Sequence, residues 1–471
     1  MGSRAIGLVG TLVVTRFITP ADYGEVSVAA VLVMTANQLS TVGFGQYLVA
    51  KPDAPRSVAF HVTGYHLLLG VVALGVLLAS GGALGPLLDA PRVARFLPGL
   101  VLSGFLDRVA FVPERIMVRD LRFGQLSITR TLGDLSHTAA SVILAALGWG
   151  GSAIVVGNVV RSFVRLVGFV AKVERRDWLE PCRPNLQHTR DLLAFGVPMS
   201  LGALCAFAAR RWDNLLVSRF FGPGPTGMYN LAYNLADVPA IQVGEQIGDV
   251  LLPSFARVEA SRRPLALVRS MSLLSLVVFP LAVGLGAVAP SLVRTIFDER
   301  WRPLAPMLVL LSALSVARPV GWTVASYLQA RERPKSIFWL EALKLVLLVV
   351  GIVTFGRSSP LWTCVAVGVS FGAHALASLW VVHRLEKIPL RPLLGSLVPA
   401  LGACLVMVGA VLLVRSAVAA SGTVAPALEL GLEVLAGALV YALAALGLAR
   451  ETSRDLWLKL RDAIRPRALP S

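Results

Sequence analysis

The sequence predicts an all-α polytopic membrane protein, and three observations carry this prediction. Only 15% of the 471 residues are charged and 56% are hydrophobic, whereas soluble domains are about 25% charged. Many windows of about 20 residues carry no charge, and this is the length that a helix needs to cross a bilayer. A long internal repeat relates two parts of the chain. We therefore expect about fourteen transmembrane helices, as two six-helix lobes followed by two C-terminal helices.

The repeat has a constant offset of 203 residues. Matching positions at this offset carry the same residue types: Arg16 and Arg219, Pro20 and Pro223, Gly24 and Gly227, and Gly45 and Gly248. Internal repeats are typical of membrane transporters, in which the substrate path lies at the repeat interface. Because each lobe has an even number of spans, we expect a parallel pseudo-twofold axis along the membrane normal.

The predicted spans follow one another with short connections. The N-terminal lobe, residues 1–171, holds spans at about 4–18, 25–50, 58–88, 94–116, 127–148 and 150–171. The C-terminal lobe, residues 192–383, holds spans at about 192–221, 227–255, 265–293, 304–330, 335–356 and 360–383. Residues 172–191 are the predicted cytoplasmic linker between the lobes. Residues 384–449 hold two additional helices, about 393–415 and 427–449, and 450–471 form a basic cytoplasmic tail.

The distribution of basic residues predicts that both termini are cytoplasmic. With the N-terminus inside, 28 of the 44 Lys and Arg residues lie in cytoplasmic segments and nine in outer segments. An excess of this kind on the cytoplasmic side is the usual signature of orientation. We therefore expect the net charge of +17 to face the anionic lipids of the bilayer and not a nucleic acid.

Patterns typical of enzymes and metalloproteins are missing from the sequence. The four cysteines are scattered, and the six histidines show no ligand spacing. No GxxxxGK[ST] phosphate-binding loop is present. The predicted outer loops are too short for a catalytic domain. We therefore expect no catalytic residues, no metal and no cofactor.

Basic residues inside the predicted spans are the candidate binding residues, since each costs about 2.5 to 3.5 kcal/mol at a helix centre. Arg108 and Arg318 occupy near-equivalent places in the two lobes. Two guanidinium groups that face each other would suit a phosphate or diphosphate, which arginine binds with a planar fork. The predicted anion-binding set is Arg108, Arg161, Arg210, Arg211 and Arg318.

The acidic residues inside spans have two interpretations. Asp213 follows Arg210 by three residues, on the same helix face, and Asp107 neighbours Arg108. On one interpretation these residues form ion pairs that hold the helices together. On the other, Asp107, Asp213 and Glu245 couple transport to an ion.

Several motifs resemble those of the oligosaccharide flippases of the polysaccharide transporter family, within the multidrug/oligosaccharidyl-lipid/polysaccharide exporter superfamily. They occupy residues 16–24, 42–49, 211–214, 219–222, 227–229 and 251–255. The similarity spans roughly residues 4–385. One departure is that members of the family usually begin well before the position of Arg4.

The resemblance implies a two-lobed bundle around a central cationic cavity that works by alternating access. It implies a polyprenyl-diphosphate-linked oligosaccharide as the substrate, moved from the cytoplasmic to the periplasmic leaflet of a bacterial inner membrane. This step would serve O-antigen, capsule or exopolysaccharide biosynthesis. A polysaccharide polymerase and chain-length proteins are then the candidate partners.

Three alternative functions stay open. A multidrug/cation antiporter of the same superfamily would favour an acidic, aromatic pocket, whereas the excess charge within these spans is cationic. A peptidoglycan lipid-precursor flippase is a closer variant. A membrane glycosyltransferase or polymerase would need carboxylates on large outer loops, and the predicted outer loops are short.

Overall fold

The computed structural model describes residues 2–50, 56–183, 185–239, 251, 255, 258–422, 424–450 and 452–455. The regular elements of this part of the chain are all helices, as the sequence predicts. By packing, the chain divides into two compact units, Met1–Asn230 and Leu231–Ser471.

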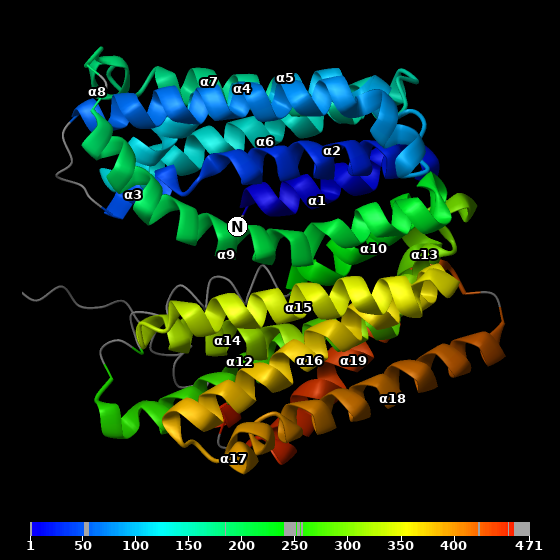
Figure 1. Cartoon of the computed structure of the whole chain (residues 1–471). Coiled ribbons are helices and arrows are strands. Elements are labelled where there is room, and N and C mark those ends of the chain that lie inside the picture. The colour runs from blue at the N-terminus through cyan, green and yellow to red at the C-terminus, as the bar shows by residue number, and fades with distance from the viewer. Residues whose placement is uncertain are drawn as a thin grey trace, which may run out of the picture. The chain divides into compact units, whose positions relative to one another are not determined.

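The first unit is a bundle of helices that lie along one another (Figure 1). They are α1 (Gly2–Val14), α2 (Pro20–Thr41), α3 (Phe44–Ala50), α4 (Arg56–Leu87), α5 (Val93–Arg119), α6 (Phe123–Ala146), α7 (Gly151–Val170), α8 (Arg176–Leu179), α9 (Leu186–Phe221) and the start of α10 (Pro223–Pro239). The central helix is α5, which packs against α2, α3, α4 and α7. In its most apolar stretch 50% of the residues are buried, against 22% in α4, so α4 presents far more surface to lipid.

The second unit continues with the end of α10 and is organised around two long helices (Figure 1). Its elements are η2 (Ala260–Arg262), α12 (Arg263–Ile296), η3 (Glu299–Trp301), α13 (Leu304–Leu314), η4 (Ser315–Ala317), α14 (Arg318–Ala330), α15 (Pro334–Thr354), η5 (Gly356–Ser358), α16 (Pro360–Glu386), α17 (Leu390–Gly395), α18 (Val398–Ser421) and α19 (Pro426–Leu448). Helix α12 packs against α13, α14, α18 and α19, and α16 packs against α13, α14 and α15.

Each of the fourteen predicted spans overlaps a helix of the described chain. Within the described residues, nine helices are long and apolar enough to cross a membrane, and α9 makes a tenth if its two arms count as one span. The remaining segments are α1, with 13 residues, and the more polar α2 and α6, while α10 runs into residues that are not described. A multi-pass membrane protein is thus established, and the number fourteen remains a prediction.

Two of the predicted spans are not straight helices. Helix α9 bends by 43° between Ala194 and Met199, in the stretch that contains Pro198. The span predicted at 304–330 is interrupted by the 3-10 turn η4, after which α14 begins at Arg318 with Pro319 in its first turn. Proline has no backbone N–H to donate and is favoured at helix starts, so the new helix begins there.

The border between the compact units differs from the predicted border between the lobes. Helix α9 packs against α2, α3 and α4, and the first unit therefore extends past the predicted linker to Asn230. The linker itself contains α8 and the buried side chain of Trp178. The two lobes are defined by the sequence repeat, and as structural domains they remain a prediction.

The repeated turn sequences become helix starts that pack on each other. Helix α2 begins at Pro20 behind the N-cap Thr19, whose hydroxyl accepts from Asp22 N, and α10 begins at the matching Pro223. A Cβ built on Gly24 would lie 1.9 Å from the carbonyl oxygen of Pro223, and one built on Gly227 would lie 1.9 Å from that of Pro20. Only glycine permits backbones to approach this closely.

Candidate functional site

Arg108 on α5 is a buried cation that is held by neutral groups. Its Nε donates to Oδ1 of Asn37 at 2.7 Å, and its Nη1 donates to the carbonyl oxygen of His66 at 2.9 Å. Its Nη2 donates to the carbonyl oxygen of Asn37 at 2.9 Å and to the hydroxyl of Ser40. The side chain thereby joins α5 to α2 and α4, and only 4% of the residue is exposed. No described carboxylate forms an ion pair with it, so its charge has no close counterpart in this part of the chain.

Small residues make room for this arginine. A Cβ at Gly70 on α4 would lie 2.2 Å from Cδ of Arg108 and 2.4 Å from its Nε. On α5, one turn before Arg108, a Cβ at Gly104 would lie 3.0 Å from Nδ2 of Asn37. The two glycines therefore permit the close approach of α2, α4 and α5 on which the hydrogen bonds of Arg108 depend.

Arg318, the predicted counterpart in the second unit, is the first residue of α14 and is 7% exposed. Its guanidinium forms an ion pair with Asp237 on α10. The Cζ atom lies 4.9 Å from the ring centre of Tyr233 and 4.8 Å from that of Phe371, within cation–π range. The cavity beside Arg318 measures about 10 Å³, near the minimum for one water molecule. The described arrangement is therefore closed around this arginine.

Arg108 and Arg318 contact corresponding helices, but their partner groups differ in charge. Arg108 contacts α2 and Arg318 contacts α10, and these two helices begin at matching positions of the sequence repeat. At the offset of 203 residues Asn37 corresponds to position 240, and Asp237 lies three residues before that position in the sequence. The partner of Arg318 is an anion, whereas the partners of Arg108 are neutral. Within the part of the chain that the structure describes, the arginine of the first unit therefore lacks the counter-charge that the arginine of the second unit has.

A second ion pair shares the ring of Phe371. Nζ of Lys344 lies 5.3 Å from the ring centre and 2.5 Å from Oε2 of Glu341. Oε1 of Glu341 is 3.7 Å from Nε2 of His374. Lys344 and His374 are both buried, so this group and the Arg318 pair form one charged region between α10, α14, α15 and α16.

Asp107 and Arg161 are brought together by α5 and α7. Asp107 interacts electrostatically with Arg161 and Arg165, and Nη2 of Arg165 lies 2.6 Å from Oδ1 of Asp134 on α6. Two arginines and two aspartates make this cluster balanced in charge. Arg108 takes no part in it, because neighbouring residues of α5 point to different helices.

Asp213 is fully buried and holds α9 to α10. Its carboxylate accepts from the hydroxyl of Tyr229 at 2.5 Å, from Asn214 N at 2.9 Å and from Asn214 Nδ2 at 3.0 Å. In turn, Nδ2 of Asn230 donates to Oδ1 of Asn214 at 2.7 Å. Two side chains of each helix thus form a polar ladder between the two helices, which the sequence analysis did not anticipate.

The remaining predicted site residues lie on α9 or outside the described chain. Arg210 is exposed and Arg211 half-buried, midway along the 36-residue α9, and both interact with other groups. Glu245 lies outside the described residues. Arg108 and Arg318 belong to different units, so their mutual approach stays a prediction.

The sequence analysis missed a buried ionic network on the two C-terminal helices. Glu433 on α19 is 0% exposed and accepts from Nε of Arg415 on α18 at 2.8 Å and from Oγ of Ser291 on α12 at 2.8 Å. Glu429, one turn earlier, accepts from Nη2 of Arg294 at 2.7 Å. Two glutamates four residues apart in an apolar span share a helix face, and this spacing was the available signal.

The all-helical fold with charged residues inside apolar helices defines a multi-pass membrane protein of the transporter type. Residues 13–306 match the family described as "Polysaccharide biosynthesis protein". The chain therefore belongs to this polysaccharide biosynthesis family, and the resemblance inferred from the motifs is confirmed.

Named relatives agree with this family. The chain is 25% identical over 397 residues to the lipopolysaccharide biosynthesis protein WzxC of Escherichia coli (strain K12), covering 83% of this chain and 78% of that one. It is 25% identical over 483 residues to the succinoglycan biosynthesis transport protein ExoT of Rhizobium meliloti (strain 1021), covering 100% and 95%. A solved structure of the lipid II flippase MurJ, in an inward closed conformation, is similar with a TM-score of 0.78 at 13% identity, over 95% of this chain and 97% of that one. At this identity the likeness shows the fold alone.

Proposed function

We propose that this protein is a flippase that moves polyprenyl-diphosphate-linked oligosaccharide from the cytoplasmic to the periplasmic leaflet of a bacterial inner membrane. Membership of the polysaccharide biosynthesis family supports the pathway. The transport protein named among the relatives supports movement of a substrate in place of its chemical conversion. The proposal accordingly contains no catalytic step.

One observation carries the choice of an anionic substrate, and it is the environment of Arg108. A buried charge is costly unless an opposite charge or a full set of hydrogen bonds compensates it. Among the described residues, the hydrogen-bond partners of Arg108 are the neutral groups of Asn37, Ser40 and His66. An arriving diphosphate would supply the missing negative charge and could accept from the same planar guanidinium.

The second arginine would bind the substrate by exchange. Arg318 is neutralised by Asp237, so a phosphate has to displace that carboxylate before it can bind. We assign Arg108 as the first contact and Arg318 as the second, with Arg161, Arg210 and Arg211 completing the cationic path. The two lobes would open to one side of the membrane at a time.

The membrane potential favours the proposed direction. Moving one negative charge outward through a negative-inside potential gains about 2.3 kcal/mol per 100 mV. Loaded transport is then electrically downhill, and the coupling ion acts in the return of the empty carrier. We assign ion coupling to Asp107, Asp213 and Glu245, since carboxylates within spans bind cations and protons in transporters.

The test is glycan export in a strain that depends on this protein. We expect Arg108→Ala to lower export strongly, Arg318→Ala to lower it less, and the double variant to abolish it with normal amounts in the membrane. Arg302→Ala is the matched control, because Arg302 is 66% exposed and pairs with Glu299 near a helix end. Full export by the double alanine variant would contradict the proposed role of Arg108 and Arg318 in substrate binding.

A further inference from the structure

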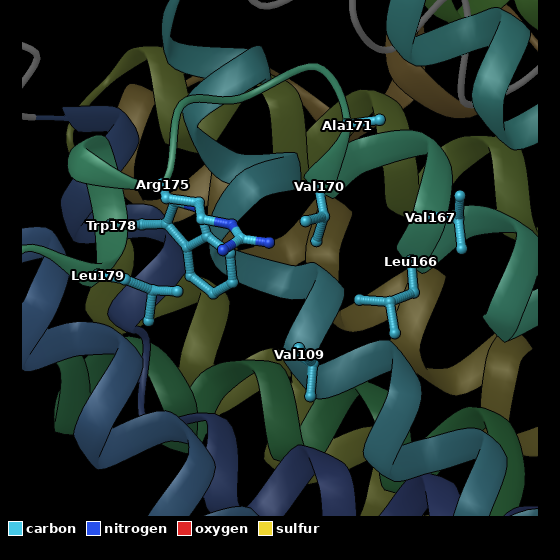
Figure 2. A pocket seen from close by; sticks show the side chains of 8 residues that line it. All are labelled: Val109, Leu166, Val167, Val170, Ala171, Arg175, Trp178 and Leu179. Carbon is cyan, nitrogen blue, oxygen red and sulfur yellow. The ribbon is translucent and has the colours of Figure 1, made fainter.

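A groove on the first unit lies between α5, α7 and α8, away from Arg108. It has a volume of about 490 Å³ and is lined by Val109, Leu166, Val167, Val170, Ala171, Arg175, Trp178 and Leu179. Figure 2 shows Arg175, Trp178 and Leu179 on one side, Leu166, Val167 and Val170 on the other, and Val109 from α5 below them. Mostly apolar walls with a few polar groups, at this size, are typical of small-molecule sites.

The apolar lining is accessible to a ligand. Val167 on α7 is 51% exposed and Leu179 on α8 is 40% exposed. Val167 lies in the last turn of α7, at the end that is predicted to reach the cytoplasmic surface of the membrane, and Leu179 lies on the short helix that follows. The groove therefore opens where the acyl chains of the inner leaflet meet their headgroups.

Two polar groups stand at the groove, and one of them lacks a partner. Trp178 is 4% exposed, and its indole Nε1–H is buried without a hydrogen-bond acceptor among the described residues. An unsatisfied buried donor is costly, and such groups are rare in folded proteins. The exposed Arg175 supplies the one charge of the lining. A donor and a cation above an apolar groove match a ligand with an anionic, oxygen-rich head and a hydrocarbon chain.

Arg175 differs from the charged residues near it in that it lines the groove. Lys172, two residues after the end of α7, donates to Oγ1 of Thr129 at 2.7 Å, and its carbonyl oxygen accepts from Nη1 of Arg122 at 2.8 Å. Asp177 and Glu174 also belong to this segment, so the surface is mixed in charge and not a broad basic patch. Selectivity would then depend on Arg175 itself, which alone among these residues lines the groove.

We propose that this groove binds one anionic glycerophospholipid of the inner leaflet. One acyl chain lies against Val109, Leu166 and Val170, the phosphate binds Arg175, and a headgroup or ester oxygen accepts from the indole N–H of Trp178. The site is independent of the flippase proposal, because it requires only that the protein resides in a membrane with this end of α7 at the cytoplasmic surface.

Native mass spectrometry of the purified full chain tests the site. The protein is delipidated in detergent and titrated with phosphatidylglycerol or with phosphatidylcholine. Both lipids carry a phosphate, but phosphatidylcholine also carries a choline cation that neutralises its headgroup and opposes Arg175. We therefore expect one phosphatidylglycerol to bind roughly tenfold more tightly than phosphatidylcholine. Arg175→Gln should remove this preference, and Trp178→Phe, which keeps a ring but loses the donor, should weaken binding of both lipids.

Two matched variants separate the site from general lipid adhesion. Arg176→Gln removes the same charge from the next residue, which does not line the groove, and should leave the preference intact. Val170→Trp should fill the groove and reduce both lipids, with the thermal unfolding temperature in detergent reporting whether the variant is folded. Equal binding of the two lipids to the wild type, or an unchanged preference in Arg175→Gln, would overturn the proposal. Displacement of phosphatidylglycerol by an equimolar polyprenyl phosphate would overturn it as well, in favour of the tail of a transported lipid.

Discussion

Gly24 and Gly227 occupy equivalent positions in the repeat and meet each other directly. A Cβ on Gly24 would lie 2.8 Å from the backbone N of Gly227, and a Cβ on Gly227 would lie 2.9 Å from the backbone N of Gly24. Each is also blocked by the carbonyl oxygen of the other's helix-opening proline, Pro20 or Pro223. The contact is thus symmetric under exchange of the two motifs, as expected if a twofold axis passes through it.

This symmetry predicts equal penalties for the two glycines. Gly24→Ala and Gly227→Ala should each destabilise the protein by about 1–3 kcal/mol or more, because a backbone carbonyl cannot move away as a side chain can. The double variant should cost less than the sum, since one displacement of the helices relieves both clashes. Thermal unfolding in detergent measures this. Gly75→Ala on α4, with nothing within 4 Å of its Cβ, is the control; a large difference between the two single variants would contradict the symmetry.

A carboxylate placed beside Arg108 should neutralise its charge while the side chain itself stays in place. Asn37→Asp is nearly isosteric and would turn the contact at 2.7 Å into an ion pair, as Asp237 provides for Arg318. We expect export to fall at least tenfold while protein stability is unchanged or increased. Gln38→Glu makes the same charge change on the next residue and should retain export. Normal export in Asn37→Asp would show that the free charge of Arg108 is not used.

A substitution that pushes Arg108 out of its place should affect export in the same direction as removing the arginine. In Gly70→Ala the new methyl group would lie 2.2 Å from Cδ of Arg108, so the side chain must leave its acceptors. We expect reduced export and a destabilisation of about 1–3 kcal/mol. Gly64→Ala, on the same helix with nothing within 4 Å of its Cβ, should be neutral. Wild-type stability of Gly70→Ala would contradict the packing described.

The ionic network of the C-terminal helices should be structural. Arg415→Met leaves Glu433 buried without its cation and should destabilise the protein by about 3–5 kcal/mol. Adding Glu433→Leu should recover much of this loss, because the uncompensated charge is then gone. Arg294→Met, whose side chain is 49% exposed, should cost about 1 kcal/mol or less. Thermal unfolding again measures the effect, and a double variant worse than Arg415→Met would contradict it.

Two variants can distinguish a role of Asp213 in ion coupling from its role in the contact between α9 and α10. Tyr229→Phe removes one hydrogen bond to the carboxylate, leaves its charge, and should destabilise by about 1–3 kcal/mol. If Asp213 couples an ion, Asp213→Asn should also abolish the dependence of export on the ion gradient, and Tyr229→Phe should preserve it. Measuring export with the gradient collapsed by an ionophore distinguishes the two. Equal gradient dependence in both variants would assign Asp213 to the helix contact alone.

The sequence predicted much of the fold because a helix needs a long apolar stretch to cross a bilayer, and such stretches can be recognised in a sequence. Each of the fourteen predicted spans overlaps a helix, and nine of the described helices are long and apolar enough to cross a bilayer. Apolar length could not locate the interruption at Ser315–Ala317, since that break depends on the position of one proline in an otherwise apolar segment. Nor did it place α9 with the first unit, because helix neighbours are chosen by packing and not by hydropathy.

The sequence predicted residues of the candidate site but not the residues that they contact. Arg108 and Arg318 were recognised because a charge in a span is costly. Asn37 and Asp237 were missed as their partners because the sequence does not show that α2 packs against α5, or that α10 contacts the start of α14. Glu433 was missed because it lies on α19, outside the internal repeat from which the candidate site was predicted.

The reciprocal glycine contact has a consequence for the origin of the chain. A half-length ancestor with one Pro-x-x-x-Gly helix start would carry a surface able to pair with an identical surface on a second molecule. Gene fusion of such a homodimer would preserve the contact, and thereafter neither glycine could drift to a larger residue alone. The mismatch between Asn37 and Asp237 would then record how far the two formerly identical subunits have specialised.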